Sequence, residues 1–154
     1  MKLLEKYLKE ELEVYLENNI RFRAIGDLSK FSKSLQNRIL KTQELTSSCN
    51  GLTQVLALNY GSKDEIIRAI KKLNEKGLEV SEKNLESCLD TAGISPVDIM
   101  IRTSGEVRLS NYLLWQNAYA EMFFVQTYWP DFTKTELDDI ISDFSRRERR
   151  FGAV

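Results

Sequence analysis

The stretch SPVDIMIRTSGEVRLSNYLLWQNAYAE, residues 95–121, joins an apolar run to a polar cluster and then to a second, largely apolar run. Its first part, residues 95–102, has an apolar centre and predicts a β-strand. The polar cluster that follows contains Arg102, Ser104, Gly105, Arg108 and Ser110. The spacing of the apolar residues after this cluster predicts a helix over residues 111–124. A strand, a polar turn and a helix in this order are typical of an α/β protein.

Helices and strands alternate over the rest of the chain as well. Apolar periodicity and turn residues predict helices over residues 1–19, 32–45, 62–76 and 82–90, strands over residues 20–27 and 51–61, and a final helix before the carboxyl end. Two helix starts carry a capping-box pattern, in which Ser62 pairs with Glu65 and Thr133 pairs with Glu136. Strands separated by helices imply right-handed crossovers and a parallel sheet, and the length is that of a single domain, residues 1–154.

The three predicted strands all end in polar or glycine-bearing turns. These turns are residues 26–27, 59–61 and 102–105. The carboxyl ends of parallel strands meet at one edge of a sheet, where α/β proteins bind their ligands. We therefore expect the three turns to contribute to one site.

The composition is that of an ordinary soluble globular protein, with 42% apolar and 29% charged residues. A formal net charge of −1 offers no basic field that would attract nucleic acid. Histidine is absent, which excludes Ser-His-Asp and Cys-His nucleophilic sites and histidine-bearing zinc sites. Cys49 and Cys88 lack CxxC spacing and indicate two reduced thiols in a cytosolic protein, with a disulfide as the less supported alternative. No apolar run approaches the roughly 20 residues of a membrane span.

The cluster from Arg102 to Ser110 is a candidate anion site. Guanidinium groups match phosphate oxygens in pairs, and free amides around Gly105 and the predicted helix start would add positive potential. The alternative is a solvated loop in which Glu106 pairs with the arginines. The position of the cluster at the end of a strand favours phosphate binding.

Two further features allow both a structural and a functional interpretation. Glu121 interrupts an apolar face, and it is either an exposed side chain, which the residues alone favour, or a Mg²⁺ ligand beside a phosphate. The segment RRERRFG, residues 146–152, is either a basic helix end or a second anion contact in which Gly152 lets the backbone approach a phosphate. Attraction to nucleic acid or anionic lipid is a third interpretation of this segment, and its acidic neighbours weaken it.

The sequence IRTSGEVRLSNYLLWQNAYAEMFF, residues 101–124, resembles the signature of the cis-prenyltransferases, and in particular of the bacterial undecaprenyl diphosphate synthases. The segments RFRAIGD, LQNRI, GLTQVLALNYG, WPDF and RRERRFG extend the resemblance over essentially the whole chain. The resemblance implies a parallel sheet surrounded by helices, with a hydrophobic tunnel. It also implies a Mg²⁺-dependent enzyme that condenses isopentenyl diphosphate with an allylic diphosphate, farnesyl diphosphate, to build undecaprenyl diphosphate for a cell-wall lipid carrier.

Carried onto these residues, the resemblance assigns Arg102, Arg108 and Ser110 to isopentenyl diphosphate and Glu121 to Mg²⁺. Arg150 and Gly152 match the family's RxG element, which reaches across a dimer interface to the neighbouring subunit's diphosphate. The implied assembly is a homodimer in the cytoplasm, with peripheral membrane contact through the lipid product and with no nucleic-acid partner.

The sequence also departs from the family pattern. Ser104 stands where the family usually has a second glycine. The family's DGNGRWA loop, whose aspartate helps to bind Mg²⁺, has no counterpart in these 154 residues, so no catalytic residue is assigned. We therefore expect the carboxyl-terminal portion of a catalytic domain, without turnover on its own.

Two other functions stay open at this point. One is a non-catalytic fragment or partner subunit that supplies the isopentenyl diphosphate half-site and the RxG tail. The other is a phosphate- or nucleotide-binding α/β domain, which ranks last because neither GxGxxG nor a P-loop lysine motif is present.

Overall fold

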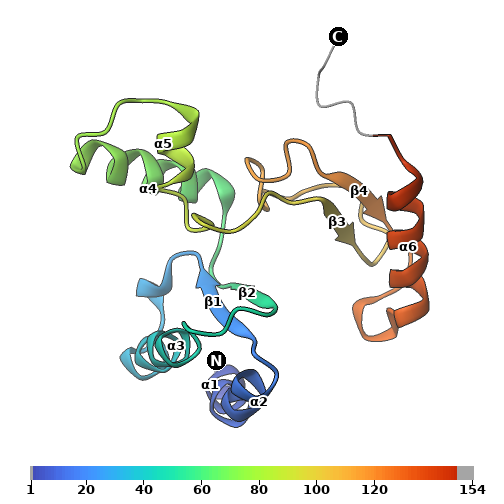
Figure 1. Cartoon of the computed structure of the whole chain (residues 1–154), viewed down its shortest axis with the longest axis horizontal. Helices are drawn as coiled ribbons and strands as arrows, with labels where there is room; N and C mark the ends of the chain where they lie inside the picture. Colours follow the sequence, from blue (N-terminus) through green and yellow to red (C-terminus); the bar gives the residue numbers. More distant parts are fainter. Residues whose placement is uncertain (1, 149–154) are drawn as a thin grey trace. The chain divides into compact units, whose positions relative to one another are not determined.

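The computed structural model describes residues 2–148, and the chain divides into two compact units, Met1–Ala92 and Gly93–Val154 (Figure 1). The first unit contains α1 (Lys2–Glu10), α2 (Leu12–Glu17), β1 (Arg21–Ile25), η1 (Leu28–Lys30), α3 (Lys33–Leu45), β2 (Thr53–Ala57), α4 (Ser62–Glu75) and α5 (Glu82–Glu86). The second unit contains β3 (Ile99–Arg102), β4 (Glu121–Phe124), η2 (Trp129–Asp131) and α6 (Lys134–Arg146). The expectation of a single domain over residues 1–154 stays a prediction.

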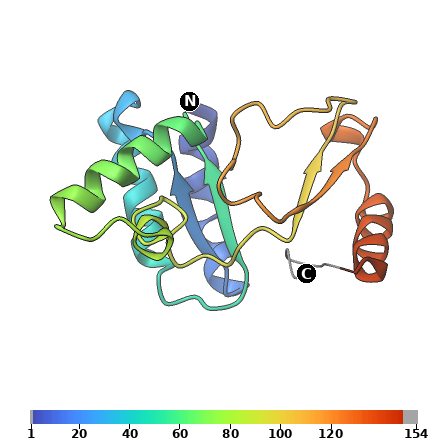
Figure 2. The same cartoon turned by 90° about the horizontal axis from the view of Figure 1, so that it is seen from above.

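The first unit is built on the parallel pair β1 and β2, joined through α3 (Figure 2). The register runs from Arg21 opposite Thr53 to Ile25 opposite Ala57. Helices α1, α2 and α3 each contribute to one buried cluster with β1. The core residues are Leu8, Tyr15, Phe22, Leu35 and Ile39, and the rings of Tyr15 and Phe22 stack with their centres 5.7 Å apart.

Strand β2 is less buried than its apolar sequence predicts. Thr53 and Gln54 are exposed, and the residues from Val55 to Ala57 are half-buried. Within the described part of the chain β2 pairs only with β1, so one side of the strand is an edge. The mostly apolar composition of residues 51–61 suits a buried strand, and that interpretation is wrong for the first half of the segment.

The second unit is built on a second parallel pair, in which Ile99 lies opposite Glu121 and Arg102 lies opposite Phe124. The predicted helix over residues 111–124 is wrong. Turns occupy most of residues 110–119, and β4 begins at Glu121. Positive φ angles of 48°, 63° and 46° at Ser110, Asn111 and Leu113 are incompatible with a helix, and pairing with β3 draws the aromatic end of the segment into a strand.

The helix ends show which local signals the fold uses. The capping box of Thr133 and Glu136 at the start of α6 is confirmed. The capping box predicted at Ser62 and Glu65 is wrong. Gly61 occupies the cap position before α4, and the buried Glu65 accepts hydrogen bonds from the Asp90 amide and the Tyr60 hydroxyl instead.

The α/β class with parallel strands is confirmed, with the four strands of the described residues in two separate pairs. Cys49 and Cys88 are free, as the sequence indicates, and both are buried. No helix within residues 2–148 combines the length and the apolar character that crossing a membrane requires.

Candidate functional site

The polar cluster begins where β3 ends, and backbone hydrogen bonds fix its first residues. The Val125 amide donates to the Arg102 carbonyl at 2.9 Å, which extends the β3–β4 pairing by one step. The amides of Ser104 and Gly105 donate to the carbonyls of Thr127 and Val125, each at 2.9 Å. The segment that follows β4 therefore holds the start of the loop in place.

These hydrogen bonds correct one expectation about the anion site. The amides of Ser104 and Gly105 already have carbonyl partners. The segment that directly follows the cluster forms turns and then β4 rather than a helix. These two amides and a helix dipole therefore do not contribute there, and the guanidinium groups of Arg102 and Arg108 are the cations of the cluster.

Ser104 and Gly105 form a tight turn with two successive left-handed residues, at φ 69° and 68°. A Cβ atom on Gly105 would lie 2.6 Å from Oε1 of Gln126, a flexible side chain that can move, so it is the positive φ that favours glycine there. Ser104 adopts the same left-handed conformation with a side chain, which is strained for an L-residue.

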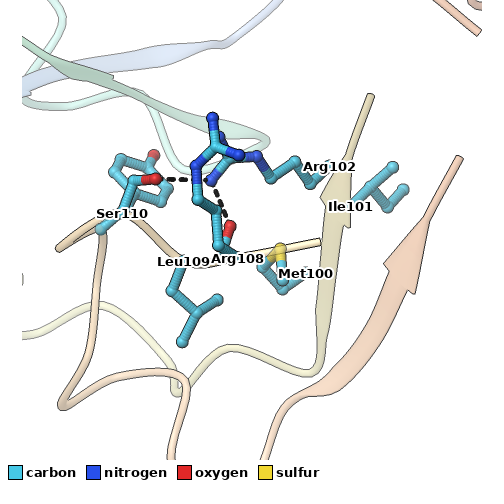
Figure 3. Close-up of a pocket in the computed structure, with 7 residues that line it drawn as sticks. Met100, Ile101, Arg102, Arg108, Leu109 and Ser110 are labelled. Atoms are coloured by element: carbon cyan, nitrogen blue, oxygen red, sulfur yellow. Dashed lines mark hydrogen bonds between the residues drawn. The ribbon is translucent and has the colours of Figure 1, made fainter. Parts of the chain in front are cut away.

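Three of the predicted site residues come together after this turn. Arg102 extends from β3 so that its Nη1 donates to Oγ of Ser110 at 3.1 Å and to the carbonyl oxygen of Arg108 (Figure 3). They line a cavity of about 270 Å³ together with four neighbours, and its full lining is Met100, Ile101, Arg102, Arg108, Leu109, Ser110 and Tyr112. Burial raises the pKa of Tyr112, which keeps its hydroxyl protonated.

The charges of this cavity remain open to solvent. The Arg108 side chain is 60% exposed and pairs with Glu106, which is 41% exposed. Exposed ion pairs contribute little free energy, so a stronger anion can displace Glu106 from Arg108. Two guanidinium groups beside the apolar side chains of Met100 and Leu109 suit a small phosphate ester with a hydrocarbon portion.

Glu121 lies in a different cluster. Its amide donates to the carbonyl of Asp98 at 2.9 Å, and its carboxylate Oε2 accepts from Nη1 of Arg147 at 2.7 Å. Glu121 opens β4 and pairs with Ile99, so it lies about 10 Å along the strands from the end at Arg102. The structure thus places Glu121 on the same strand pair as Arg102 but outside the lining of the cavity.

The residues can be tested for their fit to Mg²⁺. Within residues 2–148 no group of three or more His, Cys, Asp or Glu side chains could hold a metal ion by itself. Glu121 is 27% exposed, and its Oε1 accepts no hydrogen bond from the residues that the structure describes. Magnesium sites that use substrate phosphates need only one or two carboxylates from the protein. Glu121 therefore fits a Mg²⁺ ion that is shared with a bound phosphate.

Arg150 and Gly152, the predicted second anion contact, lie outside the described residues.

The turns that follow β1 and β2 meet, as the parallel pairing predicts. Nδ2 of Asn59 donates to the Asp27 carbonyl at 3.1 Å, and the Asp27 amide donates to the Asn59 carbonyl at 3.3 Å. A Cβ atom on Gly26 would lie 2.1 Å from the Leu58 carbonyl oxygen, so only glycine allows this approach. The two turns form one hydrogen-bonded rim at the carboxyl ends of β1 and β2 within the first unit.

A partly buried charge network that the sequence does not reveal supports this rim. Arg68 on α4 binds both carboxylate oxygens of Asp90, at 2.8 and 2.7 Å, and the Gly26 amide donates to the same carboxylate at 3.0 Å. Glu65, only 1% exposed, accepts from the Asp90 amide at 2.9 Å and from the Tyr60 hydroxyl at 2.5 Å. Burial would raise the pKa of Asp90, but the Arg68 guanidinium and the Gly26 amide outweigh it and lower that pKa.

The only readable signal for this network is the i, i+4 spacing of Asp64 and Arg68, which form an ion pair at 2.8 Å. The partner Asp90 lies 22 residues after Arg68.

Comparison with known proteins gives concordant matches. A family model described as putative undecaprenyl diphosphate synthase matches residues 1–152. The isoprenyl transferase of Wolinella succinogenes is 62% identical over the whole chain, which spans 68% of that protein. The isoprenyl transferase of Helicobacter pylori strain 26695 is 54% identical, again over the whole chain and 68% of the relative.

Solved structures agree. The crystal structure of a probable undecaprenyl diphosphate synthase from Campylobacter jejuni is similar at a TM-score of 0.91 and 46% identity, over 98% of this chain and 72% of that one. A lavandulyl diphosphate synthase from Lavandula x intermedia, solved in complex with dimethylallyl diphosphate, is similar at a TM-score of 0.88 and 31% identity, over 98% and 69% of the two chains.

Proposed function

Because the chain belongs to the undecaprenyl diphosphate synthase family of cis-prenyltransferases, we propose that it condenses isopentenyl diphosphate with an allylic diphosphate, farnesyl diphosphate. The product would be a cis-polyprenyl diphosphate, undecaprenyl diphosphate, for the cell-wall lipid carrier. The observation that carries the proposal is the cavity in which Arg102, Arg108 and Ser110 adjoin apolar side chains. Its charge and its apolar wall match the two ends of isopentenyl diphosphate.

In this proposal Arg102 and Arg108 bind the diphosphate of isopentenyl diphosphate. This substrate has no charge apart from its phosphates, so contacts to the phosphates must position it. Ser110 and the Arg108 carbonyl already hold the Arg102 guanidinium, which lowers the ordering cost of binding. Arg108 exchanges Glu106 for a phosphate oxygen, and the apolar wall at Met100 and Leu109 receives the five-carbon group.

Glu121 is the proposed ligand for Mg²⁺. When it is bound, Mg²⁺ supplies charge neutralisation for a diphosphate. The contribution of this chain is a carboxylate held at the start of β4, with the fixed cations of Arg102 and Arg108 farther along the same strand pair. Arg102 and Arg108 would hold the diphosphate that the product retains, because the diphosphate that leaves belongs to the allylic substrate.

The assembly is part of the proposal. Arg150 and Gly152 are proposed to contact the diphosphate bound by a neighbouring subunit in a homodimer. A cytoplasmic location, with peripheral membrane contact through the lipid product, follows from the same chemistry.

We expect different outcomes for substrate binding and for turnover by this chain. The 154 residues contain the assembled Arg102 cavity but no DGNGRWA-type segment, so we expect the chain alone to bind isopentenyl diphosphate without forming polyprenyl product. A non-catalytic partner subunit would not need to retain Arg102, Arg108, Ser110 and Glu121, and their presence favours membership of an active enzyme.

Isothermal titration calorimetry tests the binding step. Isopentenyl diphosphate, ATP and inorganic phosphate are each titrated into the chain in separate runs, and their affinities are compared. The proposal expects the tightest binding for isopentenyl diphosphate, because only this ligand uses both the cations and the apolar wall. Tighter binding of ATP would indicate a nucleotide-binding domain and would refute the assignment. A radiolabelled condensation assay on the same preparation tests the expected lack of turnover.

A further inference from the structure

Arg147 joins β4 to the carboxyl end of α6 through three contacts. Its Nη1 donates to Oε2 of Glu121 at 2.7 Å, and its Nη2 donates to Oδ2 of Asp143 at 2.8 Å. Its guanidinium carbon lies 4.5 Å from the ring centre of Phe123, the second residue after Glu121 on β4. One guanidinium group thus bridges two carboxylates and covers an aromatic ring.

These contacts hold the Glu121 carboxylate in place and offset its negative charge. A guanidinium group is planar and permanently charged, and each of its two Nη atoms has a separate carboxylate here. The Phe123 ring adds a cation–π attraction on one face of the group. Arg147 therefore neutralises Glu121 in the structure.

This neutralisation bears on metal binding. A divalent cation on Oε1 of Glu121 would lie within a few ångströms of the Arg147 guanidinium, well inside the screening distance of about 8 Å at physiological salt. The repulsion between a single and a double positive charge at such a separation weakens cation affinity by about tenfold even in water. A phosphate group that arrives with the cation supplies negative charge and offsets this repulsion.

We propose that Arg147 is a positioning residue that makes divalent-cation binding at Glu121 depend on a diphosphate. In the absence of diphosphate, Arg147 occupies the carboxylate as its counter-ion, and the cation binds weakly. With a diphosphate present, the cation and the phosphate oxygens bind together at Glu121. This inference rests on the proposed role of Glu121 as a metal ligand.

Paramagnetic resonance of free Mn²⁺ measures the dependence directly on the 154-residue chain, with and without isopentenyl diphosphate and with the protein-free diphosphate as a blank. The test variant is Arg147→Gln, which removes the charge. Arg147→Lys retains the charge. The matched control is Arg146→Gln, because Arg146 lies next in sequence and contacts Asp143 at 3.4 Å. Circular dichroism and thermal unfolding monitor the fold of each variant.

Without diphosphate, we expect Arg147→Gln to bind Mn²⁺ about tenfold more tightly than the native chain, with Arg147→Lys and Arg146→Gln within about twofold of it. An affinity of Arg147→Gln that is unchanged, or lower, would overturn the proposal. Arg147→Met keeps an apolar stem over Phe123, so it is the substitute if the glutamine variant fails to fold, and the same tenfold gain is expected.

A Glu121→Gln variant separates this inference from the assignment on which it rests. If Mn²⁺ binding in the presence of diphosphate survives Glu121→Gln unchanged, the metal-ligand assignment is wrong and the inference falls with it. If Glu121→Gln abolishes that binding while Arg147→Gln leaves the affinity unchanged, only the role of Arg147 is refuted.

Discussion

Replacing Arg102 with alanine removes the guanidinium group that extends from β3 to Ser110 and the Arg108 carbonyl. In the proposed complex the same group makes a charge-assisted contact to the diphosphate. A hydrogen bond to a charged group contributes about 1.5–3 kcal/mol, so we expect affinity for isopentenyl diphosphate to fall by roughly 10- to 150-fold. Arg102→Lys keeps a positive charge but loses the planar fork of the guanidinium group. Its affinity for isopentenyl diphosphate should lie between those of the native chain and Arg102→Ala.

Isothermal titration calorimetry of the variants with isopentenyl diphosphate gives this difference. Arg146→Ala is the control, because Arg146 is an exposed arginine of α6 whose described ion pair is with Asp143 alone. The control should bind as the native chain does. An affinity of Arg102→Ala within about twofold of the control would refute the assignment of Arg102 to the diphosphate. A loss in Arg102→Lys as large as in Arg102→Ala would show that the fork geometry, not the charge, carries the contact.

Three predictions concern the stability of the chain, each measured by urea unfolding. Ser104→Gly relieves the left-handed strain at φ 69° and should raise the free energy of unfolding by about 0.5–1 kcal/mol, whereas a decrease would show that Ser104 is not strained. Gly105→Ala should lower it by about 1 kcal/mol, because alanine is strained at φ 68°, and an unchanged value would contradict this turn. Arg68→Met should lower it by about 1–3 kcal/mol, because the half-buried Asp90 loses its main partner and keeps only Lys72 at 3.3 Å and the Gly26 amide. The pKa of Asp90 is lowered in the fold, so its pairing stabilises the chain above the unfolded pKa of about 3.9 and this stability is lost as pH falls through the lower folded value. Arg68→Met should flatten that acid loss, and an unaltered pH profile would count against the pairing.

Local sequence patterns predict much of the fold. The predicted helices over residues 32–45 and 62–76 and the capping box at Thr133 mark helix ends within one or two residues of those observed. The segment at residues 111–124 fails because its apolar spacing suits a helix, while its conformation depends on contacts remote in sequence. The positive φ angles near Asn111 and the pairing of β4 with β3 override the local pattern.

The contacts of the site likewise divide into those between residues close in sequence, which can be predicted, and those between residues far apart, which cannot. Arg102, Arg108 and Ser110 lie within nine residues of one another, so a single turn after a strand brings them together, and the sequence indicates this. The unavailable amide of Gly105 could not be foreseen, because its acceptor Val125 belongs to the chain after β4. The pairs of Arg68 with Asp90 and of Glu121 with Arg147 span 22 and 26 residues, and no periodic pattern connects residues so far apart.

The central claim is that isopentenyl diphosphate binds in the Arg102–Ser110 cavity, and a crystal structure of the chain with this ligand and Mg²⁺ tests it most directly. We expect diphosphate density within hydrogen-bond distance of Arg102, Arg108 and Ser110, with the five-carbon group against Met100 and Leu109. Diphosphate density elsewhere, with Arg108 still paired to Glu106, would contradict it.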